Sequence, residues 1–141
     1  MKYFTKIGLL LLCLILLQSC SMKEKPLVIG HRGAMGHETE NTLASVQKAI
    51  DLEVDMIEID IFKIKSGEIV VFHDVFVDRL ANATGKIEDY DIFYVKQMVL
   101  DFNHTIPIIH DVLNLIDNKV RLNIELKWAG TCDRVNNILK Y

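Results

Sequence analysis

The sequence contains few cysteines and no excess of positive charge. Its 141 residues include three cysteines, Cys13, Cys20 and Cys132. The first two lie in or just after an amino-terminal apolar segment, so Cys132 alone remains for the folded domain and no intradomain disulfide is expected. Sixteen basic and 19 acidic residues give a net charge of −3, without a long block of either sign. Since nucleic-acid binding needs a basic face, we expect no nucleic-acid partner.

The amino-terminal segment has the pattern of a secretory signal. Lys2 and Lys6 precede an apolar run from Ile7 to Leu17. This run is short for a bilayer core of roughly 30 Å, which favours a signal peptide over a spanning helix. The residues Leu17-Gln18-Ser19-Cys20 resemble a bacterial lipobox. We therefore predict a signal peptide over 1–19 and lipidation at Cys20, which places an exported lipoprotein on a membrane, facing the periplasm or the cell surface. An uncleaved anchor and cleavage without a lipid are the alternatives.

The remaining chain is predicted to be a short tether, residues 20–26, followed by one α/β domain, residues 27–141. Segments with strand patterns alternate with segments of helical spacing, and this order favours a parallel sheet covered by helices. The strands are expected over 27–30, 55–61, 68–72 and 120–127, and the first of them is expected to be buried. The helices are expected over 42–52, 89–100 and 107–117, and a further helix begins at 132.

Polar residues recur at the carboxyl ends of the four predicted strands, where parallel α/β folds assemble their active sites. Within the second strand the side chains alternate, so Glu58 and Asp60 share one face and three isoleucines share the other. The residues at the strand ends are His31-Arg32, Glu58 and Asp60, His73-Asp74, and Glu125 with Lys127.

Three of these residues form a candidate metal site. Two acids on one side of a strand ordinarily lie on a face that is exposed to solvent. The opposite face of this strand is apolar, however, which predicts that the strand is central in the sheet and that its carboxylates are buried. Buried carboxylates need compensating cations. Glu58, Asp60 and Glu125 supply the oxygen ligands that Ca²⁺ or Mg²⁺ prefers. Zinc is disfavoured, because no histidine or cysteine cluster accompanies them.

The strand-end histidines and cations suit chemistry at phosphorus. A single histidine after a strand is more often structural, whereas two beside a metal site favour general acid–base catalysis by His31 and His73. Arg32 offers a planar fork to phosphate oxygens, and Lys127 offers a point charge.

Six ordered motifs resemble those of the glycerophosphodiester phosphodiesterase family. They are Ile29-Gly30-His31-Arg32-Gly33, Glu40-Asn41-Thr42-Leu43-Ala44, Glu58-Ile59-Asp60, His73-Asp74, Ile106-Pro107 and Glu125-Leu126-Lys127. The resemblance implies a metal-dependent hydrolase with a (β/α)₈ barrel, which converts glycerophosphodiesters to sn-glycerol 3-phosphate and an alcohol. It further implies that the two histidines are the acid–base pair, that the three acids bind the metal, and that the phosphate or substrate contacts are Arg32, Lys127, Glu40 and Asn41.

The length of the chain limits this interpretation. A (β/α)₈ barrel typically has about 250 residues, so we expect only its amino-terminal half, truncated after about four strands. Open sheet edges invite pairing with another chain, and self-association is therefore expected. An inactive remnant and a lipoprotein binding module that retains the site residues stay as alternatives to an enzyme.

Overall fold

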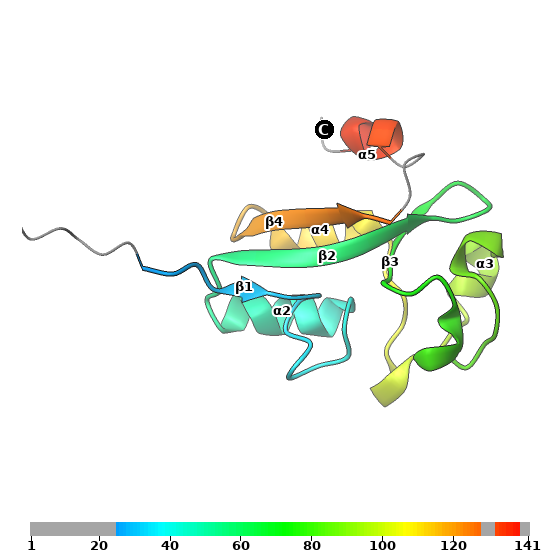
Figure 1. Cartoon of the computed structure of the whole chain (residues 1–141), viewed down its shortest axis with the longest axis horizontal. Helices are drawn as coiled ribbons and strands as arrows, with labels where there is room; N and C mark the ends of the chain where they lie inside the picture. The colour runs from blue at the N-terminus through cyan, green and yellow to red at the C-terminus, as the bar shows by residue number, and fades with distance from the viewer. Residues whose placement is uncertain (1–24, 128–131, 139–141) are drawn as a thin grey trace, which may run out of the picture.

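The computed structural model describes residues 25–127 and 132–138, shown in colour in Figure 1. The predicted signal peptide, Cys20 and most of the predicted tether lie outside these residues. Strand β2 (Met56–Lys63) is the centre of the sheet. It pairs in parallel with β1 (Ile29–Gly30) and with β4 (Arg121–Leu126), as the sequence predicts.

Strand β3 (Ile69–Val71) corrects one prediction. It pairs with β2 in the antiparallel sense, with Ile61 opposite Val71 and Lys63 opposite Ile69. The two strands are joined by a short turn around Ser66 and Gly67, whereas a parallel connection needs a crossover of a dozen or more residues. The third predicted strand is therefore the return arm of a hairpin and not a new parallel unit.

Helices α2 (Leu43–Asp51) and α4 (Ile109–Ile116) cover the apolar face of the sheet. Thr42 caps α2 in a capping box with Ser45, each side chain accepting from the backbone N–H of the other at 3.2 Å. The core under these helices contains the three isoleucines of β2, which are fully buried as the period-two alternation predicts. Its other buried members include Val46, Ala49, Ile69, Val71, Ile109, Val112, Ile116 and, from α5 (Cys132–Ile138), Val135.

The outer edge of β1 differs from the prediction of a buried strand. Leu27, Val28 and Ile29 are each at least half exposed. Strand β1 pairs with β2 on one side only, and no other described strand pairs with it. The apolar residues of this segment therefore lie along an open sheet edge.

Between β3 and α4 the chain makes a long excursion with its own small core. It contains the 3₁₀ turns Val77–Arg79 (η1), Ile87–Asp89 (η2) and Asp101–Asn103 (η3) and the short helix α3 (Ile92–Val95). Its core consists of Phe62, Ile64, Val70, Phe72, Val77, Ile87, Val95, Met98, Leu100 and Ile106. Figure 1 shows this excursion beyond the carboxyl-terminal part of β2.

The helix predicted over 89–100 is confirmed only at Ile92–Val95. Beyond it, Asn82 holds Val99 in a non-helical position, because its backbone N–H donates to the carbonyl of Val99 and its side-chain oxygen accepts from the Val99 N–H at 2.8 Å. The helix predicted from Pro107 begins two residues later. Pro107 and Ile108 pair with β3 before the chain turns into α4.

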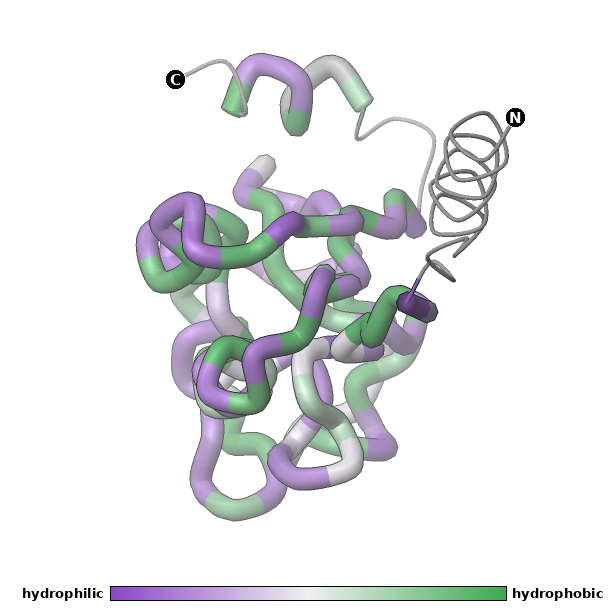
Figure 2. Tube along the Cα trace, turned by 90° about the vertical axis from the view of Figure 1, so that its left-hand side faces the viewer, coloured by the Kyte–Doolittle hydropathy of each residue, from purple (hydrophilic) through white to green (hydrophobic). Residues whose placement is uncertain are grey.

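Hydrophobic and hydrophilic residues alternate along the described chain and do not gather into one block (Figure 2). Among the described residues, none of the helices has the length and apolar character needed to cross a bilayer.

Candidate active site

The loops after β1 and β3 meet on the same edge of β2. Ile61 pairs with Val71 of β3 on one side and with Leu126 of β4 on the other, and β1 likewise lies opposite β4. The first loop is fixed by the N–H of Gly33, which donates to the Glu58 carbonyl at 3.1 Å. The second loop is fixed by the N–H of Phe72, which donates to the Asp60 carbonyl at 3.0 Å. The antiparallel return of β3 thus places His73 beside the strand that carries the acids.

The three predicted acids come together. Glu58 is 7% exposed and Asp60 is 1% exposed, which confirms that the polar face of β2 is buried. Glu125 lies opposite Asp60 in the register of β4 and is exposed. One carboxylate oxygen of each residue lies within 4.8 Å of those of the other two. Two neighbouring parallel strands therefore present three carboxylates to one point.

This cluster fits a hard divalent cation. Oε1 of Glu58 is buried and accepts no hydrogen bond from any described residue. A buried, ionised oxygen without a partner is costly, and a cation would compensate it. The ligand set contains only carboxylate oxygens, the donors that Ca²⁺ and Mg²⁺ take.

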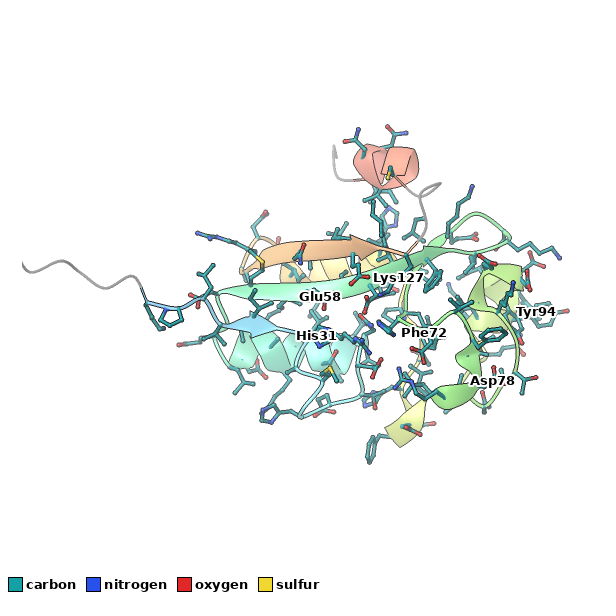
Figure 3. The ribbon with its side chains drawn as sticks, in the orientation of Figure 1. His31, Glu58, Phe72, Asp78, Tyr94 and Lys127 are labelled. Atoms are coloured by element: carbon teal, nitrogen blue, oxygen red, sulfur yellow. The ribbon has the colours of Figure 1, made fainter. Side chains whose placement is uncertain are left out.

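Lys127 follows β4 and contacts two of the three acids. Its Nζ lies 2.8 Å from Oδ1 of Asp60 and 2.6 Å from Oε1 of Glu125. Burial by itself would lower the pKa of Lys127, but its hydrogen bonds to Asp60 and Glu125 outweigh this effect and raise it. The ammonium therefore supplies positive charge inside the acidic cluster. Figure 3 shows Lys127, Glu58 and His31 around the middle of β2.

The loop after β1 turns sharply at Arg32 and Gly33, whose φ angles are 52° and 79°. A Cβ atom on Gly33 would lie 2.4 Å from Oγ of Ser45, so this position requires glycine. The turn directs the Arg32 N–H to Oε2 of Glu58 at 2.9 Å. It also leaves His31 with a largely exposed side chain whose Nε2 is 3.8 Å from the same Glu58 oxygen.

Asn41 holds the other acid of β2. Its side-chain Nδ2 donates to Oδ2 of Asp60 at 2.9 Å, and its Oδ1 accepts from the Asp60 N–H at 3.2 Å. Asn41 has a φ of 56°, a conformation that asparagine tolerates better than most residues. Its observed partner is thus an acid of the cluster.

A cluster around Arg79 joins the remaining predicted residues. Arg79 donates from Nε to Oδ2 of Asp74 at 2.6 Å, from Nη1 to Oε2 of Glu40 at 3.0 Å and from Nη2 to Oε1 of Glu40 at 2.7 Å. Nη1 of Arg32 donates to the same Oε1 at 2.8 Å. The other Asp74 oxygen lies 2.6 Å from Nδ1 of His73. No sequence pattern singled out Arg79, and Asp74 was predicted only as part of a motif.

Both carboxyls of this cluster are held in the ionised form. The hydrogen bond from Arg79 is the main cause that lowers the pKa of Asp74, to about 2. At Glu40, burial acts to raise the pKa, but hydrogen bonds from Arg79 and then Arg32 outweigh it and lower the pKa. The pKa of Arg79 is raised by the same two carboxylates.

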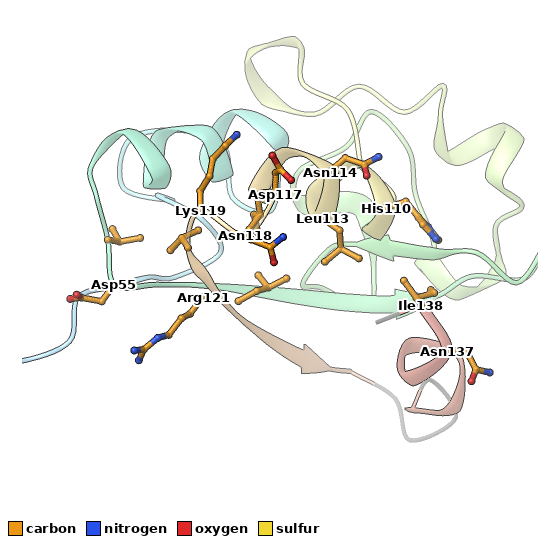
Figure 4. Close-up of a pocket in the computed structure, with 14 residues that line it drawn as sticks. Asp55, His110, Leu113, Asn114, Asp117, Asn118, Lys119, Arg121, Asn137 and Ile138 are labelled. Atoms are coloured by element: carbon orange, nitrogen blue, oxygen red, sulfur yellow. The ribbon is translucent and has the colours of Figure 1, made fainter. Parts of the chain in front are cut away.

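Two hollows flank the sheet, and one of them adjoins the cluster. A hollow of about 540 Å³ is lined by His73, Asp74, Arg79 and Lys127 together with apolar side chains such as Phe62 and Phe76. A larger one, of about 1530 Å³, lies between β4, α4 and α5 and is lined by residues including His110, Asn114, Lys119, Arg121 and Ile138 (Figure 4). None of the predicted site residues lines the larger hollow, so we place the candidate site at the smaller one.

Comparison with known proteins points to one family. Residues 31–134 match the model of the glycerophosphoryl diester phosphodiesterase family. A glycerophosphodiester phosphodiesterase of Caldanaerobacter subterraneus subsp. tengcongensis is 37% identical over 111 residues, which cover 73% of this chain and 46% of the relative. The chain thus spans about half the length of the relatives it matches.

Solved structures agree with the sequence comparison. A phosphodiesterase of Oleispira antarctica, solved in complex with the product sn-glycerol-3-phosphate, is 30% identical with a TM-score of 0.76, over 82% of this chain and 52% of that one. A glycerophosphodiester phosphodiesterase of Thermotoga maritima is 30% identical with a TM-score of 0.74, over 84% and 51%. These likenesses confirm the predicted α/β fold class, part of a (β/α)₈ barrel.

Proposed function

Because the chain belongs to the glycerophosphoryl diester phosphodiesterase family, we propose that it hydrolyses glycerophosphodiesters to sn-glycerol 3-phosphate and an alcohol in a metal-dependent reaction. The observation that carries the proposal is the convergence of Glu58, Asp60 and Glu125 within 4.8 Å, beside the loops that carry His31 and His73. The product named with the Oleispira antarctica structure supports the same substrate class.

The acids of the cluster would hold Ca²⁺ or Mg²⁺. Such a cation, when bound, neutralises charge on a phosphodiester oxygen and so favours displacement at phosphorus. Arg32 and Lys127 bring two more positive charges to the same place. Glu40 keeps the Arg32 guanidinium in position through the 2.8 Å hydrogen bond, and Asn41 does the same for the Asp60 carboxylate. The substrate phosphate is therefore proposed to lie between the cation site and these side chains.

The two histidines move the protons. One imidazole takes a proton from the attacking water as the new P–O bond forms, and the other donates a proton to the oxygen of the leaving alcohol as the old P–O bond breaks. Their placement supports these roles, because His31 and His73 come from separate loops on one edge of β2 and each keeps one ring nitrogen without a described protein partner.

The experiment is release of sn-glycerol 3-phosphate from glycerophosphocholine and glycerophosphoethanolamine by the full chain, with and without a chelator. We expect release that the chelator stops and a divalent cation restores. His31→Ala should abolish it, whereas His110→Ala, at an exposed position of α4, should leave it unchanged. Full activity of His31→Ala, or release of sn-glycerol 3-phosphate at the same rate with and without the chelator, would contradict the proposal.

The second candidate is a binding module, or an inactive remnant, that retains the site residues. The open outer edge of β1 favours it, since the described sheet is not closed into a barrel. If the wild-type chain binds a divalent cation and glycerol 3-phosphate but releases no product under any of the conditions above, this candidate replaces the enzyme.

The site would act at a membrane surface. We infer this from the lipobox-like residues that end at Cys20, and metabolic labelling with a fatty acid tests it: wild type should carry the label and Cys20→Ser should not.

Self-association is also proposed, through the exposed edge of β1. Sedimentation of the purified chain tests it, and a Val28→Lys substitution on that edge should shift the distribution toward the monomer.

A further inference from the structure

Arg79 bridges the two loops that carry the proposed catalytic histidines. It lies in the 3₁₀ turn η1, six positions after His73, and its guanidinium makes three hydrogen bonds of 2.6–3.0 Å. Two of these form a bidentate pair with Glu40, which precedes α2, and the third reaches Asp74. A planar fork that contacts two carboxylates from distant parts of the chain fixes their relative position.

The Asp74 carboxylate that Arg79 binds also contacts the imidazole of His73. Oδ2 of Asp74 accepts from Arg79, and Oδ1 lies 2.6 Å from Nδ1 of His73. An ionised carboxylate only accepts hydrogen bonds, so Nδ1 carries a proton, and in the neutral imidazole Nε2 therefore keeps its lone pair. An aspartate carboxyl with its ordinary pKa of 3.8 is already ionised at neutral pH, so what the 2.6 Å hydrogen bond from Arg79 to Oδ2 fixes is the orientation of this carboxylate. The tautomer and the ring orientation of His73 therefore depend on Arg79.

The Glu40 carboxylate that Arg79 binds also accepts a hydrogen bond from Arg32. Oε1 of Glu40 accepts from Nη2 of Arg79 at 2.7 Å and from Nη1 of Arg32 at 2.8 Å. The Arg32 N–H in turn holds Oε2 of Glu58. Arg79 is thus connected through one carboxylate to the proton-transfer group and through another to the phosphate-binding group.

We propose that Arg79 is a positioning residue, which fixes the imidazole of His73 through Asp74 and the guanidinium of Arg32 through Glu40. The proposal rests on the proposed function for its catalytic consequence, but its structural part stands without turnover. The side chain of Arg79 is 47% exposed, so we expect its ion pairs to make only a modest contribution to the free energy of unfolding.

The structural part is tested by ¹⁵N NMR of histidine ring nitrogens in the full chain at mildly alkaline pH. In wild type, His73 should be the Nδ1–H tautomer. Arg79→Met should convert it to a mixture of tautomers, and Arg79→Lys, which keeps a charge but not the fork, should restore it in part. Arg121→Met is the matched control, because this arginine is exposed on β4, and it should leave the His73 signals unchanged.

If Arg79→Met does not fold, Asp74→Asn tests the link through which Arg79 is proposed to act on His73. The amide can donate to Nδ1, so His73 should shift toward the Nε2–H tautomer. The proposal would be overturned if His73 of the wild type is in the Nε2–H form, or if its tautomer is the same in the wild type and in both variants.

The catalytic consequence is read from kinetics on the same proteins. We expect Arg79→Met to lower kcat by at least about tenfold, as the loss of a group that orients a functional residue typically does. Arg79→Lys should recover part of the loss, and Arg121→Met should show none. Unchanged kcat in Arg79→Met with an altered tautomer would overturn the positioning role. A wild-type chain without turnover refutes the proposed enzyme, while the tautomer experiment still decides whether Arg79 sets the geometry.

Discussion

The ammonium nitrogen of Lys127 lies 2.8 Å from Oδ1 of Asp60, a carboxylate that is 1% exposed. The same nitrogen contacts Glu125 at 2.6 Å. Lys127 therefore holds together two of the three acids that are proposed to bind a divalent cation, and it reduces the repulsion between them.

Removal of the Lys127 charge should destabilise the metal-free protein. We expect Lys127→Met to lower the free energy of unfolding by roughly 2–3 kcal/mol in the presence of a chelator, because Asp60 loses its shorter ion pair and keeps only the 3.4 Å contact with Nε of Arg32. Addition of Ca²⁺ or Mg²⁺ should recover more stability in the variant than in wild type. Urea denaturation with and without the cation measures both effects.

The matched control is Lys119→Met, at an exposed position whose Nζ donates only to the Leu115 carbonyl at 3.3 Å. This change should stay within about 0.5 kcal/mol of wild type. Equal effects of the two substitutions would show that Lys127 does not stabilise the acidic cluster.

Asn41 should stabilise the protein through its side chain and not only through its backbone. Asn41→Ala removes two hydrogen bonds to Asp60 at 2.9 and 3.2 Å and leaves alanine at a φ of 56°. We expect a loss of about 3 kcal/mol, which combines the hydrogen bonds to a buried charge with the left-handed backbone. Thermal or urea unfolding provides the measurement.

Asn118 separates the two contributions. It has a φ of 59° and is exposed, so Asn118→Ala should lose only the backbone part, about 1 kcal/mol. If both alanine variants lose the same stability, the hydrogen bonds between Asn41 and Asp60 contribute nothing measurable.

Asp74 should make part of the stability depend on pH. Its pKa is lowered from 3.8 to about 2, chiefly by the hydrogen bond from Arg79. A carboxyl with a lower pKa in the folded state stabilises the protein above its unfolded pKa, and this contribution disappears as the pH falls through the folded pKa. We expect Asp74→Asn to lose on the order of 1 kcal/mol at neutral pH.

The difference between wild type and Asp74→Asn should then shrink as the pH is lowered from about 4 to about 2. Urea titrations at a series of pH values measure it, and Asp89→Asn, at an exposed position of η2, serves as the control. A difference that stays constant over this range would contradict the assigned role of the Arg79 hydrogen bond.

The acidic cluster was predictable because strand geometry is local. Side chains of β2 alternate with period two, and the fully apolar face of Ile57, Ile59 and Ile61 implied that the strand is central. A central strand buries both faces, so the burial of Glu58 and Asp60 could be predicted from the sequence. The partnership with Glu125 followed from the rule that polar residues at the ends of parallel strands meet at one edge.

The direction of β3 was not recognised, although the sequence contains the signal. Apolar residues of a short strand look the same in a hairpin and in a parallel unit, but the connection around Ser66 and Gly67 is too short for a crossover. His73 nevertheless reaches the site, because the hairpin brings it back along β2.

Arg79 and Asn82 show what sequence patterns could not give. Arg79 is a single arginine in an irregular segment without periodicity, and its partners are fixed only by how the excursion folds over Glu40 and Asp74. Asn82 holds Val99, which was predicted to be helical, in a non-helical position through two hydrogen bonds. Such side-chain contacts between distant segments are determined by tertiary structure, which overrides local propensity.

The central claim is that Glu58, Asp60 and Glu125 form one divalent-cation site, and calorimetric titration of the full chain with Ca²⁺ and with Mg²⁺ tests it most directly. The account predicts saturable binding of at least one of these ions at a single site, abolished by Asp60→Asn and retained in Asp89→Asn. Binding of equal strength by Asp60→Asn and wild type, or no saturable binding by wild type, would contradict it.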